Sequence, residues 1–202
     1  MRPEGLKVDG KQLETSAATA GLGYVKSSQT GSGFQTFTAE KTSEGTSWGA
    51  VYARSFQPLT DITDAQSGLK VKREVIVPDA QGNTLNSQLS TLNSLKVGDR
   101  IRIRITIEAE RDYDFVQVAD KRAACLEPIG QLSGYHWGYY CAPRDNVTNY
   151  YFDRLAKGTH IVETEYYVDR TGTYQTGTCT VQCAYSPEYS ARAAARQLTV
   201  TE

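Results

Sequence analysis

One segment of the sequence restricts the fold more than any other. From Arg100 to Glu108 the residues alternate strictly, with four isoleucines at every second position and charged or polar residues between them. Successive side chains of a β-strand point to opposite faces, so this pattern predicts an antiparallel strand with one buried and one solvent-facing side. The preceding Val97-Gly98-Asp99 is typical of a turn.

Other segments also favour strands, and the composition agrees with an all-β chain. The 202 residues include 13 Tyr and 17 Gly but a single Met, which is typical of twisted strands joined by tight turns. Strands at this spacing with little helix favour a β-sandwich. Further strands are predicted over residues 22–26, 34–41, 47–56, 69–77, 114–119, 160–168, 174–185 and 196–200.

Two local signals organise the first third of the chain. Residues 6–13 are predicted to form two short strands around Asp9-Gly10, a dipeptide that suits the two positive φ angles of a type I′ hairpin. The turn-rich segment 58–64 has room for one helical turn and precedes the strand over 69–77. We therefore predict two domains, 1–65 and 66–202.

Charge and hydropathy make two kinds of partner improbable. The chain has 22 basic and 23 acidic residues, a net charge of −1, and no Lys/Arg cluster. This balance argues against a nucleic-acid or anionic-membrane partner. The longest apolar runs contain only a few residues, far below the ~18 that a spanning helix needs, so no direct membrane insertion is expected.

The four cysteines leave two arrangements open. Cys179 and Cys183 lie four residues apart in a predicted strand, ~13 Å at ~3.3 Å per residue, which is too far for a disulfide. A bridge between Cys125 and Cys141 would leave the other two as buried thiols, and four reduced thiols is the alternative. With only two histidines and no pair of Cys-x-x-Cys motifs, no metal site is expected.

Candidate catalytic residues are few, and we predict no catalytic site and no cofactor. A cysteine nucleophile would need His136 or His160 within hydrogen-bonding distance, and His160 is expected at the surface at the entrance of a strand. Glu163 and Glu165 share one strand face, which is typical of a solvated face. A cysteine hydrolase would contain one thiol that reacts with iodoacetamide well below pH 8.

An aromatic segment is the main candidate for an interaction surface. Tyr135, Trp137, Tyr139 and Tyr140 lie within six residues, and Tyr150-Tyr151-Phe152 follows nearby. Exposed aromatic rings could stack on sugar rings or on the side chains of a partner. A structural use, in the core or as a cover over one end of the sandwich, is the alternative.

The order of several short motifs resembles the C-terminal region of bacterial alpha-2-macroglobulin proteins. The segment Trp48-Gly49-Ala50-Val51-Tyr52 is similar to the return strand of the interrupted CUB domain in that family. Later motifs are similar, in the same order, to the family's final macroglobulin-like domain. They are residues 97–103, 112–116, 126–128, 133–135, 151–159 and 183–189.

This resemblance implies a macroglobulin-like β-sandwich over 66–202, preceded by the second part of a CUB-like domain over 1–65. It also implies a location in the bacterial cell envelope, although residues 1–5 contain no apolar signal segment. Family members are protease traps that change conformation when a target protease cuts a bait segment, and some then bond covalently through a Cys-x-Glu-Gln thioester. No cysteine here is followed by x-Glu-Gln.

The expected role is therefore a non-catalytic scaffold in a larger protease inhibitor. The partners that the resemblance implies are the other domains of the parent protein and, through them, target proteases. The alternative function is a β-sandwich adhesion or glycan-binding module that uses the aromatic segment 135–140.

Overall fold

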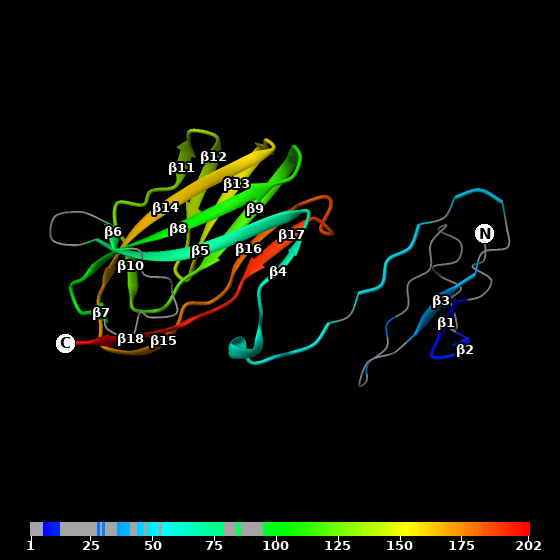
Figure 1. Cartoon of the computed structure of the whole chain (residues 1–202), viewed down its shortest axis with the longest axis horizontal. Helices are drawn as coiled ribbons and strands as arrows, with labels where there is room; N and C mark the ends of the chain where they lie inside the picture. The colour runs from blue at the N-terminus through cyan, green and yellow to red at the C-terminus, as the bar shows by residue number, and fades with distance from the viewer. Residues whose placement is uncertain are drawn as a thin grey trace. The chain divides into compact units, whose positions relative to one another are not determined.

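The structure is a computed structural model that forms two compact units, Met1–Phe56 and Gln57–Glu202 (Figure 1). It describes residues 6–12, 28, 30, 36–40, 44–46, 48–52, 54–78, 84–85 and 95–202. The division between the units falls nine residues before the end of the first predicted domain. Asp64, within those nine residues, accepts a hydrogen bond from the backbone of Ala194, so this segment is attached to the second unit.

The first unit contains a small antiparallel sheet. β1 (Leu6–Val8) lies between β2 (Lys11–Gln12) and β3 (Phe37–Ala39). Asp9 and Gly10 have φ angles of +47° and +76°, so the predicted two-residue hairpin with two positive φ angles is confirmed. Every residue of this unit whose burial is described is exposed.

The strand predicted over 47–56 is wrong for the residues that can be checked. Residues 48–52 and 54–56 have no regular secondary structure, and the side chains of Trp48 and Phe56 are exposed. A strand needs hydrogen bonds from a neighbouring strand, and the residue pattern alone could not show whether a neighbour is present. The strand predicted over 22–26 lies outside the described residues.

Two large sheets face each other in the second unit (Figure 1). The five-stranded sheet has the order β10-β14-β8-β5-β6, and the seven-stranded sheet has the order β11-β12-β13-β9-β16-β17-β4. A third, smaller sheet has the order β15-β18-β7. The strands are β4 (Ala65–Ser67), β5 (Leu69–Pro78), β6 (Thr84–Leu85), β7 (Leu95–Lys96), β8 (Arg100–Ala109), β9 (Tyr113–Lys121), β10 (Leu126–Pro128), β11 (Gly134–His136), β12 (Tyr139–Pro143), β13 (Val147–Leu155), β14 (Gly158–Val168), β15 (Gly172–Gln175), β16 (Cys179–Cys183), β17 (Ser190–Ala193) and β18 (Gln197–Thr201).

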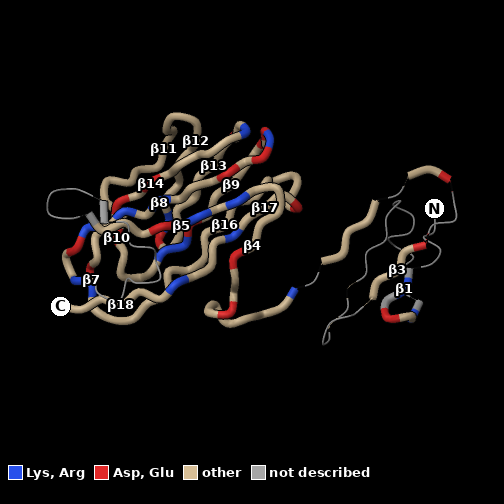
Figure 2. Tube along the Cα trace, in the orientation of Figure 1, with Lys and Arg blue, Asp and Glu red and all other residues tan. Residues whose placement is uncertain are grey.

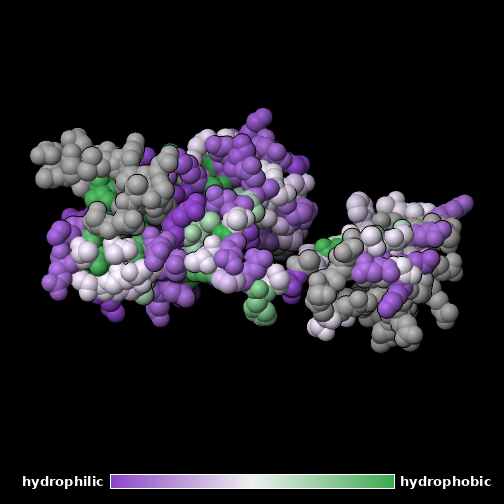
Figure 3. Space-filling model, turned by 60° about the horizontal axis from the view of Figure 1, so that its bottom comes forward, coloured by the Kyte–Doolittle hydropathy of each residue, from purple (hydrophilic) through white to green (hydrophobic). Residues whose placement is uncertain are grey.

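The predicted all-β sandwich and its most regular strand are confirmed. In β8, Ile101, Ile103, Ile105 and Ile107 are each at most 1% exposed, and they join one core with apolar residues of the seven-stranded sheet such as Val118. Burial of four isoleucines on one side is the outcome that the alternating pattern predicts. The visible outer surface of the described second unit is mostly hydrophilic (Figure 3).

Other sequence predictions are confirmed in outline. The segment over 58–64 contains a single turn of 3-10 helix, η1 (Leu59–Asp61). The strands expected over 69–77, 114–119, 160–168 and 196–200 correspond to β5, β9, β14 and β18.

The single long strand predicted over 174–185 is wrong, because the chain forms two strands in different sheets. β15 pairs with β18, whereas β16 pairs with β9 and β17. The change of direction occurs around Gly177, which has φ of +71°, and a Cβ added there would lie 2.6 Å from the Cβ of Lys121. Both the positive φ and the close approach require glycine at this position.

Candidate functional site

The predicted aromatic segment forms a β-hairpin at one edge of the seven-stranded sheet. β11 and β12 pair with His136 opposite Tyr139, and Trp137-Gly138 is the connecting turn. Gly138 has φ of +94°, a conformation that favours glycine. Trp137 is fully exposed and Tyr135 is 78% exposed. Two of the four predicted surface residues are therefore presented to solvent.

The other two predicted residues face opposite sides of the sheet. Tyr139 packs on the core, with its ring 5.3 Å from that of Phe152 and 5.7 Å from that of Tyr150. Tyr140 faces outward, where its ring makes an edge contact with Tyr135 at a centroid distance of 5.1 Å. The outer surface of the hairpin consequently contains Tyr135, Trp137 and Tyr140 but not Tyr139.

A row of uncharged polar side chains continues from this hairpin across the outer face of the sheet. The strand registers place Tyr135 opposite Tyr140, Tyr140 opposite Tyr151, and Tyr151 opposite Gln117. Gln182 of β16 lies opposite Gln117. Neighbouring strands are ~4.8 Å apart, so these five side chains extend over roughly 19 Å. We call them the tyrosine–amide row.

Smaller side chains occupy the next outward positions along the same strands. They are Ala142, Asn149, Ala119 and Thr180. The amide of Gln117 donates a hydrogen bond from Nε2 to Oδ1 of Asn149 at 3.1 Å. A shallow hollow of about 250 Å³ lies where β16, β17 and β4 meet, and Gln182 and Arg192 are among the residues that line it. The tyrosine–amide row therefore runs from the aromatic hairpin to this hollow.

A strained backbone position lies near the row on β9. Phe115 has φ of +53°, a conformation that is rare for a bulky residue. Two exposed residues, Asp114 and Phe115, separate the buried Tyr113 and Val116, so the in-and-out alternation of β9 shifts its phase here. The partner strand β13 shifts at the matching place, with two exposed residues between Phe152 and Leu155.

The side chain that this strain exposes is part of an aromatic pair. Phe115 is 52% exposed, Tyr185 is 82% exposed, and their rings make an edge contact at 5.4 Å with an interplanar angle of 88°. The backbone N–H of Ala184 donates to the carbonyl of Phe115 at 2.8 Å, which fixes the two segments together. Phe115 and Tyr185 each lie in a family-like motif, 112–116 and 183–189, but no sequence pattern indicated that the two residues are in contact.

The outer face of the five-stranded sheet has different chemistry. Arg102 donates to Oε1 of Glu165 at 2.8 Å, and Arg104 donates to Oε1 of Glu163. The hydrogen bond from Arg102 lowers the pKa of Glu165 below its ordinary value. Basic and acidic residues are interspersed over the second unit (Figure 2). The prediction that Glu163 and Glu165 lie on a solvated face is confirmed.

An ion pair lies buried between the two large sheets. Nε of Arg73, on β5, lies 2.9 Å from Oδ1 of Asp120, on β9, and both side chains are 1% exposed. Arg73 also donates to the carbonyls of Lys121 at 3.0 Å and Gly177 at 3.3 Å. Burial raises the pKa of Asp120, and the guanidinium of Arg73 opposes that rise. The pair connects the sheets electrostatically.

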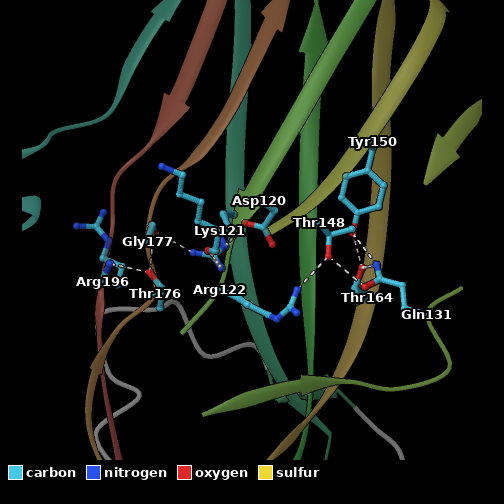
Figure 4. Close-up of polar contacts among 11 residues, drawn as sticks. Asp120, Lys121, Arg122, Gln131, Thr148, Tyr150, Thr164, Thr176, Gly177 and Arg196 are labelled. Atoms are coloured by element: carbon cyan, nitrogen blue, oxygen red, sulfur yellow. Dashed lines mark hydrogen bonds and ion pairs between the residues drawn. The ribbon is translucent and has the colours of Figure 1, made fainter. Parts of the chain in front are cut away.

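A second group of buried polar side chains lies nearby, and its members point toward one another (Figure 4). Gln131 donates to Oγ1 of Thr164 at 3.2 Å, and Thr148 donates to Oε1 of Gln131 at 3.1 Å. The hydroxyl of Tyr150 is hydrogen-bonded to Thr164, and burial raises the pKa of Tyr150 well above its ordinary value. These groups satisfy one another, as buried polar atoms must.

All four cysteines are buried free thiols in the structure. The bridge proposed between Cys125 and Cys141 is not formed in it and stays a prediction. Burial raises the pKa of every thiol, and it does so most strongly at Cys179, where Asp120 raises the pKa further. Because the thiolate is the nucleophilic form, these surroundings disfavour cysteine catalysis.

The two histidines contact groups other than a cysteine. His160 is half-buried, and its Nε2 lies 2.7 Å from the carbonyl oxygen of Ala156. His136 stacks on Tyr139 at 5.3 Å. Within the described part of the chain, no group of three or more His, Cys, Asp or Glu side chains is placed to hold a metal ion. No described helix has the length and apolar character needed to span a membrane.

A family comparison decides how this sandwich is classified. The family model of the bacterial alpha-2-macroglobulin MG10 domain matches residues 68–188, more than half of the chain. The chain belongs to this family. The match lies within the second unit and includes β5, β8, β9, β13 and β14, so the predicted resemblance to the C-terminal region of bacterial alpha-2-macroglobulins is confirmed. No curated protein matches the chain.

Solved bacterial alpha-2-macroglobulin structures share this fold. An Escherichia coli alpha-2-macroglobulin structure spanning domain MG7 to the C-terminus aligns with a TM-score of 0.59 and 20% identity, over 72% of this chain and 25% of that one. Salmonella alpha-2-macroglobulin reacted with methylamine aligns with a TM-score of 0.58 and 22% identity, over 70% of this chain and 10% of that one. Trypsin-activated alpha-2-macroglobulin from Escherichia coli aligns with a TM-score of 0.57 and 19% identity, over 70% of this chain and 11% of that one. The matched part of this MG10 family member thus spans at most a quarter of each of those chains.

Proposed function

We propose that this chain is a non-catalytic scaffold and interaction segment of a larger alpha-2-macroglobulin-like protease inhibitor. The MG10 family match over residues 68–188 supports this assignment. So does the small share of each related chain that the match covers, since an MG10 domain would then work as one part among many. In this proposal, residues 66–202 are the macroglobulin-like domain and residues 1–65 are part of a CUB-like domain.

The exposed pair Phe115 and Tyr185 is the observation that supports the scaffold role most directly. A bulky residue at positive φ costs of order 1–3 kcal/mol and persists only where the surrounding structure imposes it. Here the strained residue is 52% exposed, so burial within this chain does not compensate for the strain. A neighbouring domain of the parent that covers both rings would supply the missing burial.

This contact would serve the conformational change of the inhibitor. In the proposed mechanism, the pair packs against another domain while the bait segment is intact, and cleavage of the bait releases that contact. Domain interfaces of this kind have two discrete arrangements rather than a continuous range. The chain itself would contact target proteases only through the parent, in the bacterial cell envelope. Covalent capture would require a thioester elsewhere in the parent.

The test uses the full-length parent protein with and without trypsin. Denaturing gels would show whether one upstream cut dominates, and native gels would show whether the cut protein changes its mobility. We expect a single dominant cut with a mobility shift. We also expect the parent with Phe115→Ala and Tyr185→Ala to show part of that shift before any protease is added.

Tyr167→Ala is the matched control for these substitutions. Tyr167 is 45% exposed, close to the value for Phe115, and it lies on the outer face of the other large sheet. The control should behave as wild type in both gels. The scaffold proposal would be wrong if trypsin produced no preferred cut, or if the Phe115 and Tyr185 variants matched the control before and after cleavage.

A further inference from the structure

We propose that the tyrosine–amide row is a binding site for a neutral glycan chain. The row consists of Tyr135, Tyr140, Tyr151, Gln117 and Gln182, placed directly opposite one another on five adjacent strands. This site is separate from the contact proposed for Phe115 and Tyr185, and neither proposal depends on the other.

The chemistry of the row matches the two kinds of surface that a sugar presents. The apolar face of a sugar ring packs on an aromatic ring, and the three tyrosines supply such rings together with a hydroxyl each. The hydroxyls of a sugar pair with groups that both donate and accept. The carboxamides of Gln117 and Gln182 do both.

The amide of Gln117 is already oriented for this purpose. Its Nε2 donates to Oδ1 of Asn149 at 3.1 Å, a contact that uses one of its two N–H groups. By their chemistry, Gln117 keeps a second N–H and its carbonyl oxygen, and Asn149 keeps its NH₂ group. The pair holds both amides in one geometry on the outer face, so less side-chain entropy is lost when a ligand binds.

The absence of charge along the row selects the kind of glycan. None of its five members is Asp, Glu, Lys, Arg or His, whereas Arg and Glu residues fill the central positions on the outer face of the other sheet. Interfaces with proteins are enriched in Arg and Met as well as in aromatic residues, and the row contains neither Arg nor Met. A neutral polysaccharide needs neither ion pairs nor a large apolar patch.

The shape around the row also suits an extended chain. The small residues Ala119 and Thr180 lie opposite each other beside Gln117 and Gln182, and Thr180 also lines the hollow at this end of the row. The hollow of about 250 Å³ lies at the far end, beyond Gln182. At the near end, Trp137 is fully exposed in the hairpin turn and adds one more aromatic ring.

Calorimetric titration of the 202-residue chain with neutral hexasaccharides tests the proposal. Cellohexaose, chitohexaose and maltohexaose are the probes, since they share charge and length but differ in linkage and substituents. We expect saturable binding to at least one of them. Tyr140→Ala and Tyr151→Ala should each weaken that binding about tenfold, as expected for the loss of one stacked ring.

Tyr167→Ala again serves as the control, because Tyr167 is 45% exposed and Tyr151 is 41% exposed. It should bind as wild type does, and circular dichroism should show the same fold for all three variants. The proposal is overturned by absence of saturable binding to all three probes. It is equally overturned if the Tyr140 and Tyr151 variants bind as tightly as wild type, or if the control loses binding to the same degree.

Discussion

The outer faces of the two large sheets differ, although their inner faces contribute to one common core. On the five-stranded sheet, Arg102 and Arg104 form ion pairs with Glu163 and Glu165 across β8 and β14. On the seven-stranded sheet, the corresponding surface is the uncharged tyrosine–amide row. Exposed ion pairs are solvated and contribute little to the free energy of unfolding. The charges of the first face are therefore satisfied by one another and by water. The second face keeps the rings of Tyr135, Tyr140 and Tyr151 next to one another, whereas the exposed Tyr167 of the first face lies opposite Arg100.

The two sheets also differ in the regularity of their strands. β8 alternates between buried and outward positions over its whole length, whereas β9 shifts phase at Phe115. Irregular and strained positions concentrate at functional surfaces. In the five-stranded sheet, β8 and its partner β14 are therefore regular along their paired central positions. The seven-stranded sheet is where both proposed contacts lie.

The largest expected loss of stability comes from removing a charge that is buried between the sheets rather than one on their outer surfaces. Asp120→Ala leaves Arg73 buried without its counter-charge, so we expect the free energy of unfolding to fall by about 3–5 kcal/mol. Glu165→Ala removes an exposed partner and should lower it by less than about 1 kcal/mol. Urea denaturation of both variants measures the difference.

A double variant checks the cause of that loss. Arg73→Met combined with Asp120→Leu removes both charges and keeps most of the volume, so it should recover at least half of the stability that Asp120→Ala loses. Equal stability of the Asp120→Ala and Glu165→Ala proteins would show that losing a charge from the buried pair costs no more stability than losing one from a surface pair.

An effect of intermediate size is the difference in stability between a valine and a glycine variant at the same position. This difference should have opposite signs on the two sheets. Ile161, on the outer face of β14, is 56% exposed and pairs with Thr106. There we expect Ile161→Val to be more stable than Ile161→Gly by about 1 kcal/mol, because β-branched residues favour strands. At the positive φ of residue 115, Phe115→Gly should instead be more stable than Phe115→Val by about 1–2 kcal/mol.

Thermal unfolding of the four variants gives the two differences. Each Val and Gly pair is compared at one position, so the effect of removing the original side chain is common to both variants and cancels. If valine were the more stable residue at both positions, the strain assigned to Phe115 would be absent and the contrast between the two backbones would be weaker than described.

The smallest expected effect is the pH dependence of the surface ion pairs. The hydrogen bond from Arg102 lowers the pKa of Glu165, so the ionised carboxylate stabilises the folded protein above the pKa of the unfolded chain. That contribution is lost as pH falls through the lowered pKa of the folded state. At pH 7 the free energy of unfolding of wild type should exceed that of Glu165→Gln by at most about 1 kcal/mol, because these side chains are partly exposed.

Denaturation at pH 7 and at pH 3 would follow this difference, and 1 M salt should reduce it at pH 7. Glu108→Gln provides the comparison, since Glu108 pairs with Lys70 at 3.2 Å with both side chains more than half exposed. The Glu108 substitution should have the smaller effect. A difference for Glu165→Gln that persisted unchanged at pH 3 would contradict the assigned role of its charge.

Local signals explain which parts of the fold could be predicted. The alternation in β8 and the Asp9-Gly10 turn each depend on a few consecutive residues, and both are confirmed. The long strand over 174–185 failed because the pattern is continuous across Gly177. Only the close approach of the Lys121 backbone and side chain shows that the chain must change sheets there.

The candidate surfaces could be predicted only in part, for the same reason. Tyr135, Trp137 and Tyr140 are close in sequence, so the aromatic segment was visible as a cluster. Gln117 and Gln182 join them through strand register, which depends on how β9, β13 and β16 pair. The pairing of Phe115 with Tyr185 depends on a backbone conformation that neighbouring residues do not encode.

Short-range patterns were enough to predict that the chain forms β-strands, where its most regular strand lies, how its first hairpin turns and which family its motifs resemble. Each of these follows from the stereochemistry of neighbouring residues or from their order. Which charges are buried depends instead on contacts between strands that are distant in the sequence. Arg73 lies in the charged run Lys72-Arg73-Glu74 and points inward, because Asp120 of the opposite sheet supplies the counter-charge that burial requires.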